Sequence, residues 1–137
     1  MLHHPPTGSL PRIVVGEAEE YRLSALATAA ALTGNAEMVA RKLLAEMERA
    51  SVVRDADVPR DVVRMQSLVE FEIDGANRRR VRVVYPGEAD IDSGKISILT
   101  PIGTALIGLA PGQKIPLQGH DGRAHSLTVL SVAPGEG

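Results

Sequence analysis

The sequence contains no cysteine and no tryptophan, and it has only one phenylalanine and two tyrosines. The lack of cysteine excludes disulfide bonds and thiolate metal sites, and it suits a reducing cytoplasm, where we expect the protein to act. With so few aromatic rings, the core has to be built from Val, Leu, Ile, Ala and Met. A substrate pocket lined by aromatic side chains, such as a prolyl isomerase needs, is therefore not expected.

Long apolar runs and a strong net charge are also missing. No segment approaches the roughly 20 apolar residues that cross a bilayer, so no membrane association is expected. The formal net charge is −2, whereas proteins that wrap nucleic acid carry a clear basic excess to neutralise phosphates. We therefore expect a protein partner, with nucleic acid contacted only through the resulting complex.

Residues 12–54 are expected to form an antiparallel helical hairpin, a short coiled coil. Apolar and small residues recur at spacings of three and four in residues 21–32 and again in residues 39–50. Gly34 lies between the two runs as a helix stop, and Asn35 is expected to cap the second helix. The seam is rich in alanine and buries little area, so the hairpin is expected to lean on the rest of the chain.

The segments flanking the hairpin are expected to be irregular. Residues 1–11 should be a disordered tail, since they lack the apolar region of a signal peptide, and the adjacent His3 and His4 are not expected to bind metal. Acidic residues at positions 17, 19 and 20 open the first helix, where they complement its dipole. Residues 51–61 contain charges and a proline, so a linker without regular structure is expected there.

Residues 55–137 are expected to form an α+β domain, a mainly antiparallel sheet with one short helix. Thr100 should cap that helix and Pro101 should occupy its first position, with the helix running over residues 102–109. Alternating apolar residues predict strands within residues 69–73, 81–85, 96–98, 114–117 and 126–132.

The segment from Ser97 to Gly108 contains the pattern Ser-x-x-x-Pro-x-Gly-x-Ala-Leu-x-Gly. Pro101 fixes the first turn of the helix, and Gly103 allows the helix to approach the sheet closely. This pattern resembles the C-terminal domain of the Gre factors, the bacterial transcript-cleavage factors. The resemblance implies an FK506-binding-protein-like fold for this half of the chain.

A second string resembles the Rnk branch of the same GreA/GreB superfamily, the regulators of nucleoside diphosphate kinase. It reads Pro-x-Asp-Val-Val-x-Met-x-Ser over residues 59–67, and Val-Tyr-Pro at residues 84–86 also matches. The resemblance implies binding to the secondary channel of RNA polymerase, with the C-terminal domain docked at the rim and a hairpin too short to reach the catalytic metal. We expect the protein to be a monomer. A direct action on nucleoside diphosphate kinase is a weaker alternative.

The hairpin tip consists of Gly34, Asn35 and one carboxylate, Glu37. A Gre-type cleavage factor needs two acids at this tip to help hold a second Mg²⁺ and an attacking water. We therefore expect a regulator that is not an enzyme and that has no metal and no cofactor of its own. The alternative, a Gre-type factor that stimulates transcript cleavage by the polymerase, would require Glu37 to act in the channel instead of only satisfying the helix dipole.

Other candidate sites are expected to be without catalytic function. His120 and His125 stand near Asp121 at a predicted turn, with no serine or cysteine nucleophile pattern beside them, so exposed turn residues are expected. The stretch from Gly103 to Gly108 lacks the Lys-Ser/Thr pair of a phosphate-binding P-loop.

The arginine run on the second predicted strand has three interpretations. Arg80 and Arg82 should share one face, with Arg79 on the other. The run could be a solvated face paired against Glu70 and Glu72, a docking patch for an acidic polymerase surface, or a nucleic-acid contact. The docking candidates are Arg78, Arg79, Arg80, Arg82, Ser97, Pro101 and Gly103.

Overall fold

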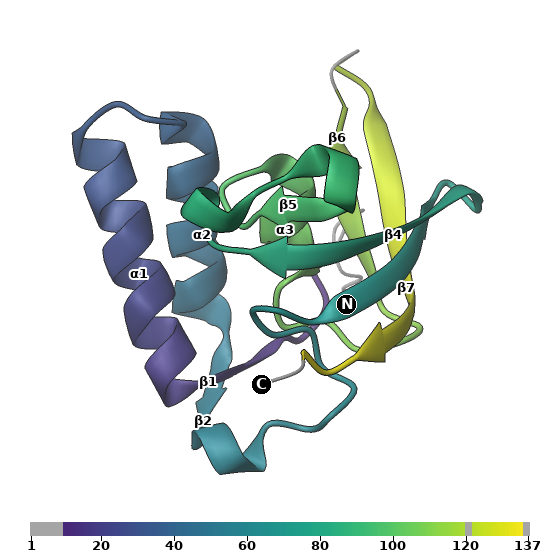
Figure 1. Ribbon diagram of the computed structural model, residues 1–137, viewed down its shortest axis with the longest axis horizontal. Helices are drawn as coiled ribbons and strands as arrows, with labels where there is room; N and C mark the ends of the chain where they lie inside the picture. Colours follow the sequence, from purple (N-terminus) through teal and green to yellow (C-terminus); the bar gives the residue numbers. More distant parts are fainter. Residues whose placement is uncertain (1–9, 120–121, 136–137) are drawn as a thin grey trace, which may run out of the picture.

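The computed structural model describes residues 10–119 and 122–135. The chain begins with strand β1 and a helical hairpin, continues into a curled sheet, and carries one short helix inside the curl (Figure 1). Of the predicted tail, residues 1–9 lie outside the described residues, while Leu10 is exposed and the carbonyl of Pro11 accepts a hydrogen bond from Arg49.

The two predicted helices are confirmed as α1 (Glu17–Leu32) and α2 (Glu37–Arg49). Gly34 has a φ of +74°, and the amide of Asn35 donates to the carbonyl of Ala30, which closes α1 in a Schellman motif. The prediction that Asn35 caps α2 is wrong, because Ala36 occupies the cap position in the left-handed conformation and no side chain bonds there.

The ends of the hairpin are tied together by a pair of strands that the sequence did not reveal. Strand β1 (Val14–Gly16) pairs in parallel with β2 (Ser51–Val53), and η1 (Asp55–Asp57) follows as a single 3-10 turn. Residues 51–61 are therefore not an irregular linker throughout. Each strand is only 3 residues long, too short for an alternating pattern to be recognised.

The second half of the chain is the predicted α+β domain. Its five-stranded sheet has the order β5-β4-β3-β7-β6, and all neighbours are antiparallel except β4 and β5. Two 3-10 turns, η2 (Pro86–Glu88) and η3 (Ile91–Ser93), connect β4 to β5. The strands are β3 (Leu68–Ile73), β4 (Ala76–Val84), β5 (Lys95–Ser97), β6 (Lys114–Gln118) and β7 (Ala124–Ala133).

The helix inside the curl, α3 (Pro101–Leu106), begins as predicted and ends earlier than predicted. The Thr100 hydroxyl accepts a hydrogen bond from the Gly103 amide at 3.1 Å, and Pro101 takes the first helical position. A Cβ on Gly103 would lie 2.3 Å from the Ser97 carbonyl oxygen. Only glycine therefore lets α3 lie this close to the end of β5.

One hydrophobic core joins the hairpin to the domain. Leu23 on α1 and Leu43 on α2 are fully buried in the same cluster as Phe71, Leu106 and Leu127. Burying a leucine or phenylalanine side chain contributes about 1.5–3 kcal/mol, so this shared core fixes the hairpin to the domain. Within the described residues, no helix is both long and apolar enough to cross a membrane.

Candidate functional site

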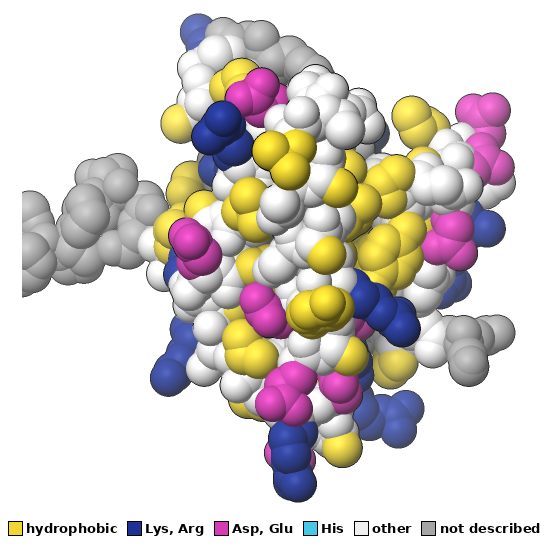
Figure 2. Space-filling view, turned by 90° about the vertical axis from the view of Figure 1, so that its left-hand side faces the viewer, with side chains coloured by type: hydrophobic (Ala, Val, Ile, Leu, Met, Phe, Trp, Pro, Cys, Tyr) yellow, Lys and Arg dark blue, Asp and Glu magenta, His cyan; other side chains and the backbone are white. Residues whose placement is uncertain are grey.

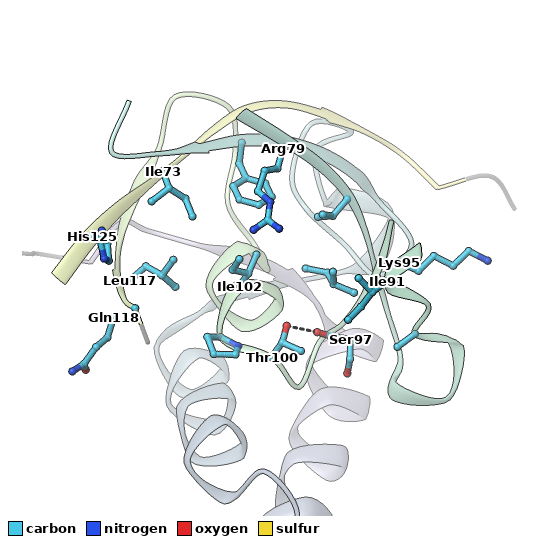
Figure 3. A pocket seen from close by; sticks show the side chains of 16 residues that line it. Ile73, Arg79, Ile91, Lys95, Ser97, Thr100, Ile102, Leu117, Gln118 and His125 are labelled. Atoms are coloured by element: carbon cyan, nitrogen blue, oxygen red, sulfur yellow. Dashed lines mark hydrogen bonds between the residues drawn. The ribbon is translucent and has the colours of Figure 1, made fainter. Parts of the chain in front are cut away.

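The inner face of the curled sheet and the start of α3 enclose a cavity of about 700 Å³, here called the concave pocket (Figure 3). Its wall comes from β3, β4 and β5 on one side and from α3 and β6 on the other. The apolar lining includes Phe71, Ile73, Val81, Ile96, Ile102 and Leu117. This cavity could not be predicted from the sequence, because its walls come from segments that are far apart along the chain.

Ser97 and Pro101 line the concave pocket, and Gly103 lies directly behind them at the start of α3. The Ser97 hydroxyl accepts a hydrogen bond from the Leu99 amide at 3.0 Å, and the Ser97 carbonyl accepts one from the Thr100 hydroxyl at 2.7 Å. The Ser97 side chain is thus used to shape the turn before α3. These residues build one wall of the pocket and present no reactive group.

The arginines of β4 divide between the two faces of the sheet. Arg79 lines the concave pocket beside Val81, as the alternation predicts. Arg80 stands opposite Glu70, but Arg82 stands opposite Leu68, and the strand register shifts around Glu72. The pairing with Glu72, which belongs to the interpretation of a solvated face, is therefore wrong, because the irregularity displaces that residue from the ladder.

Arg82 has a structural partner that the sequence did not suggest. Its guanidinium donates a hydrogen bond to the Gln66 carbonyl at 2.7 Å, which ties β4 to the segment before β3. Arg78, Arg79 and Arg80 are all exposed. The arginine run therefore consists of one anchored residue and three exposed residues. It does not form a single patch, because Arg79 lies on the pocket face of β4 and Arg78 and Arg80 lie on the other face.

His125 lies at one end of the concave pocket and contacts Asp74 across the sheet. Its Nδ1 is 2.6 Å from Asp74 Oδ2, and the Ser126 amide donates to Asp74 Oδ1 at 2.8 Å. The hydrogen bond from His125, followed by that from Ser126, holds the pKa of Asp74 below its usual value. The expectation that His125 is an exposed turn residue is wrong, because it is half-buried in β7, while His120 and Asp121 lie outside the described residues.

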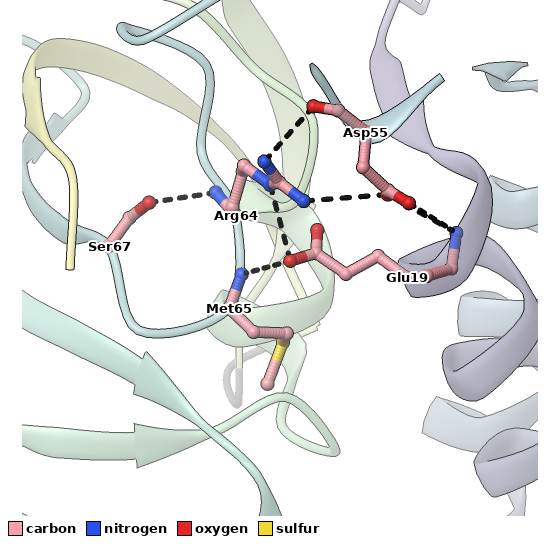
Figure 4. A network of polar contacts seen from close by, with 6 residues as sticks. Glu19, Asp55, Arg64, Met65 and Ser67 are labelled. Atoms are coloured by element: carbon pink, nitrogen blue, oxygen red, sulfur yellow. Dashed lines mark hydrogen bonds and ion pairs between the residues drawn. The ribbon is translucent and has the colours of Figure 1, made fainter. Parts of the chain in front are cut away.

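A second polar cluster, here called the junction network, lies where the hairpin meets the domain (Figure 4). Asp55 accepts hydrogen bonds from the Ala18 amide at 3.2 and 3.3 Å, and so supplies the N-terminal cap that Gly16 cannot provide. A Cβ on Gly16 would lie 2.2 Å from the Asp55 carboxylate. The glycine therefore leaves space for the Asp55 carboxylate, which follows the second arm of the hairpin and returns to cap the first.

Arg64 joins the two acids of the junction network. Its Nε lies 3.3 Å from Glu19 Oε2, and its Nη2 lies 3.5 Å from Asp55 Oδ1. The Met65 amide also donates to Glu19 Oε2 at 3.3 Å, but the buried Oε1 of Glu19 has no hydrogen-bond partner in the described structure. Burial raises the pKa of Glu19, in opposition to the nearby Arg64.

The hairpin tip carries one carboxylate, and that carboxylate is already paired. Glu37 Oε2 accepts hydrogen bonds from Arg41 at 3.0 and 2.8 Å on the exposed surface of α2. Leu32 and Met38 in the same segment are 83% and 86% exposed, so the tip presents two large apolar side chains to solvent. Across the whole hairpin face, Figure 2 shows hydrophobic side chains scattered among acidic and basic ones.

Metal binding finds no support in the geometry. Among the residues that the structure describes, no three His, Asp or Glu side chains are grouped so that they could hold an ion. A lone Glu37 in an ion pair is a poor ligand for Mg²⁺, which usually takes carboxylates together with other oxygens.

Comparisons with known proteins match the chain along most of its length. The family model "Transcription elongation factor, GreA/GreB, C-term" matches residues 58–134. The chain is 33% identical over 125 residues to a "Regulator of nucleoside diphosphate kinase" from Escherichia coli (strain K12), covering 90% of each protein. It is also 33% identical over 94 residues to a "Transcription elongation factor GreA" from Thermodesulfovibrio yellowstonii, covering 68% of this chain and 59% of that protein.

A solved structure shares the fold of both halves. The "Prokaryotic transcription elongation factor GreA/GreB from Nitrosomonas europaea" superposes with a TM-score of 0.69 at 33% identity. The superposition covers 89% of this chain and 99% of that one. The predicted combination of a helical hairpin with a domain of the GreA/GreB type is thereby confirmed.

Proposed function

Because this chain belongs to the GreA/GreB C-terminal family of transcription elongation factors, we propose that it binds bacterial RNA polymerase and regulates transcription without stimulating transcript cleavage. The observation that carries this proposal is the family match over residues 58–134, together with similarity to an Escherichia coli regulator over 90% of both chains. In this proposal the protein acts as a monomer, with residues 55–137 as the docking domain and residues 12–54 as the hairpin that enters the secondary channel.

The docking surface is proposed to include exposed residues of β4 and the turn before α3. The side chains of Arg78 and Arg80 are exposed and make no hydrogen bond or ion pair among those described, so they are available for an acidic partner surface. Electrostatic complementarity of this kind mainly raises the association rate, and salt weakens it.

The absence of cleavage is proposed from the tip and from the length of the hairpin. The longer arm, α1, has 16 residues and spans about 24 Å. The only carboxylate at the hairpin tip is that of Glu37, at the start of α2, and it is paired with Arg41. The same segment exposes the side chains of Leu32 and Met38. A second Mg²⁺ and an attacking water would need at least one more acidic ligand.

The test combines binding with a cleavage assay on the full chain. The protein should bind core RNA polymerase and displace a Gre factor, so that cleavage in a backtracked elongation complex falls toward the intrinsic rate. Cleavage that rises above the intrinsic rate, and that is lost in Glu37→Gln, would instead assign the chain to the cleavage-stimulating class. Failure to displace the Gre factor at saturation would contradict the shared channel site.

A further inference from the structure

We propose that the concave pocket binds a small amphipathic anion, a molecule with an aliphatic body and one carboxylate. The proposal rests on the shape, lining and charge of this cavity and does not depend on polymerase binding. The cavity of about 700 Å³ falls in the range of small-molecule sites.

The lining of the pocket suits an aliphatic body. Phe71, fully buried, is part of its wall, and Ile96, Ile102 and Leu117 contribute further apolar surface. Ile91 also lines the pocket but is 84% exposed. A ligand that covers this isoleucine removes its apolar surface from water, which favours binding at about 25 cal/mol per Å² of apolar area buried.

The charge of the pocket selects an anionic head group. Arg79 extends from β4 into the cavity toward Ile102 (Figure 3). Neither a hydrogen bond nor an ion pair of this guanidinium occurs among the described residues. Lys95 also borders the pocket, but its side chain points away from the cavity (Figure 3), and none of the described lining residues is an aspartate or glutamate. A carboxylate on the ligand would therefore meet Arg79 without competition, in a charge-assisted and often bidentate hydrogen bond.

The sheet itself offers the ligand few polar groups. Strand β3 is paired with β4 on one side and with β7 on the other, so its amides and carbonyls are used in the ladder. Strand β4 is paired with β3 along its length, but with β5 only at residues 82–84. The Ser97 hydroxyl is bonded to the Leu99 amide, and His125 is held by Asp74. Recognition would therefore rest on apolar contact and on one cationic group, which fits a fatty-acid-like molecule better than a polar metabolite.

The experiment is a calorimetric titration of the full chain with sodium decanoate below its micelle concentration. We expect saturable binding at one site per chain, with 1-decanol, which has the same chain length and no charge, binding at least about tenfold more weakly. Arg79→Gln should weaken decanoate binding by about tenfold. Arg78→Gln removes the neighbouring arginine, which is equally exposed but does not line the pocket, and should leave binding unchanged.

A second variant tests the place of the aliphatic body. Ile73→Trp adds volume to the half-buried rim of the pocket and should reduce decanoate affinity, with folding checked by the unfolding temperature. The proposal is overturned by any of three results: no saturable binding, equal binding of decanol, or equal loss in Arg78→Gln and Arg79→Gln. If decanoate does not bind but polymerase protects the pocket residues from hydrogen exchange, the cavity is instead a protein-docking surface.

Discussion

The carboxylate of Asp55 accepts hydrogen bonds from the backbone amide of Ala18, 37 residues earlier in the chain. Asp55, which follows the second arm of the hairpin, thus caps α1, the first arm. The cap makes the start of α1 depend on the correct return of the chain after α2, so the hairpin and its root are expected to unfold together.

Replacing the cap tests this dependence. Asp55→Ala should lower the free energy of unfolding by about 1–2 kcal/mol, the usual range for the loss of an N-terminal cap. Asp57→Ala is the matched control, because Asp57 lies in the same turn but pairs only with the exposed Arg54, and its loss should cost less than about 0.5 kcal/mol. Urea denaturation measures both, and equal losses would contradict a specific role for Asp55.

Gly16→Ala should act through the same cap. The added Cβ would fall 2.2 Å from the Asp55 carboxylate and force it away from the Ala18 amide, although the φ of −73° at Gly16 suits alanine. Gly16→Ala should therefore lower the free energy of unfolding much less in a chain that already carries Asp55→Ala. A double-mutant cycle measures this difference, and additive losses of unfolding free energy would show that Gly16 has another role.

The two shifted carboxyl groups predict opposite effects of pH. Burial raises the pKa of Glu19, so its contribution to stability is present below the ordinary pKa of 4.5 and is lost as the pH rises through the folded-state value. Glu19→Gln should therefore gain stability relative to the unmodified chain as the pH rises from 4 toward 7. The opposite slope in denaturation experiments would mean that the ion pair with Arg64 outweighs burial.

Asp74 provides the comparison. Hydrogen bonds from His125 and Ser126 lower its pKa, so its contribution is present above the ordinary value of 3.8 and is lost as the pH falls through the folded-state value. Asp74→Asn should therefore approach the stability of the unmodified chain as the solution is acidified. If the difference in unfolding free energy between Asp74→Asn and the unmodified chain stays constant down to the most acidic pH, the assigned hydrogen bonds are contradicted.

The arginines of β4 should separate in their effect on folding. Arg82→Ala removes a hydrogen bond from a charged group to the Gln66 carbonyl and should cost about 1.5–3 kcal/mol. Arg80→Ala, on the same face but exposed, should stay within about 0.5 kcal/mol. Charge reversal for docking experiments therefore belongs at Arg78 and Arg80, where reduced polymerase binding can be separated from misfolding.

The two exposed apolar side chains of the hairpin tip should matter for the effect on polymerase but not for folding. Leu32→Ser with Met38→Ser changes side chains that are 83% and 86% exposed, so stability should move by less than about 0.5 kcal/mol. Regulation of transcription should weaken in an in vitro assay. Tyr21→Ser, at another exposed position of the hairpin, is the control. Unchanged regulation in the tip variant would remove the tip from the proposed function.

The elements that the sequence predicted are those whose signals are local. The helical spacing of residues 17–50, the Thr100 cap and the alternation in β3 each depend on neighbours within a few positions. The pattern around Pro101 and Gly103 also carried enough specific residues to indicate the family.

The interactions that sequence reasoning missed connect distant segments. Glu19 was assigned only to the helix dipole, but its ion pair is with Arg64, 45 residues away. His125 was expected to be an exposed turn residue, and its partner Asp74 is 51 residues away. The concave pocket likewise depends on how far the sheet curls around α3, which no single segment determines.

The parallel pairing of β1 with β2 has a consequence for how deep the hairpin can reach. Both arms leave the domain from one fixed root, where Val14 faces Ser51 and Gly16 faces Val53. Equal insertions in the two arms would leave this root unchanged and move the tip outward by about 1.5 Å per residue of each arm. The reach of the hairpin would then be set by the number of residues beyond the root, without any change to the root itself.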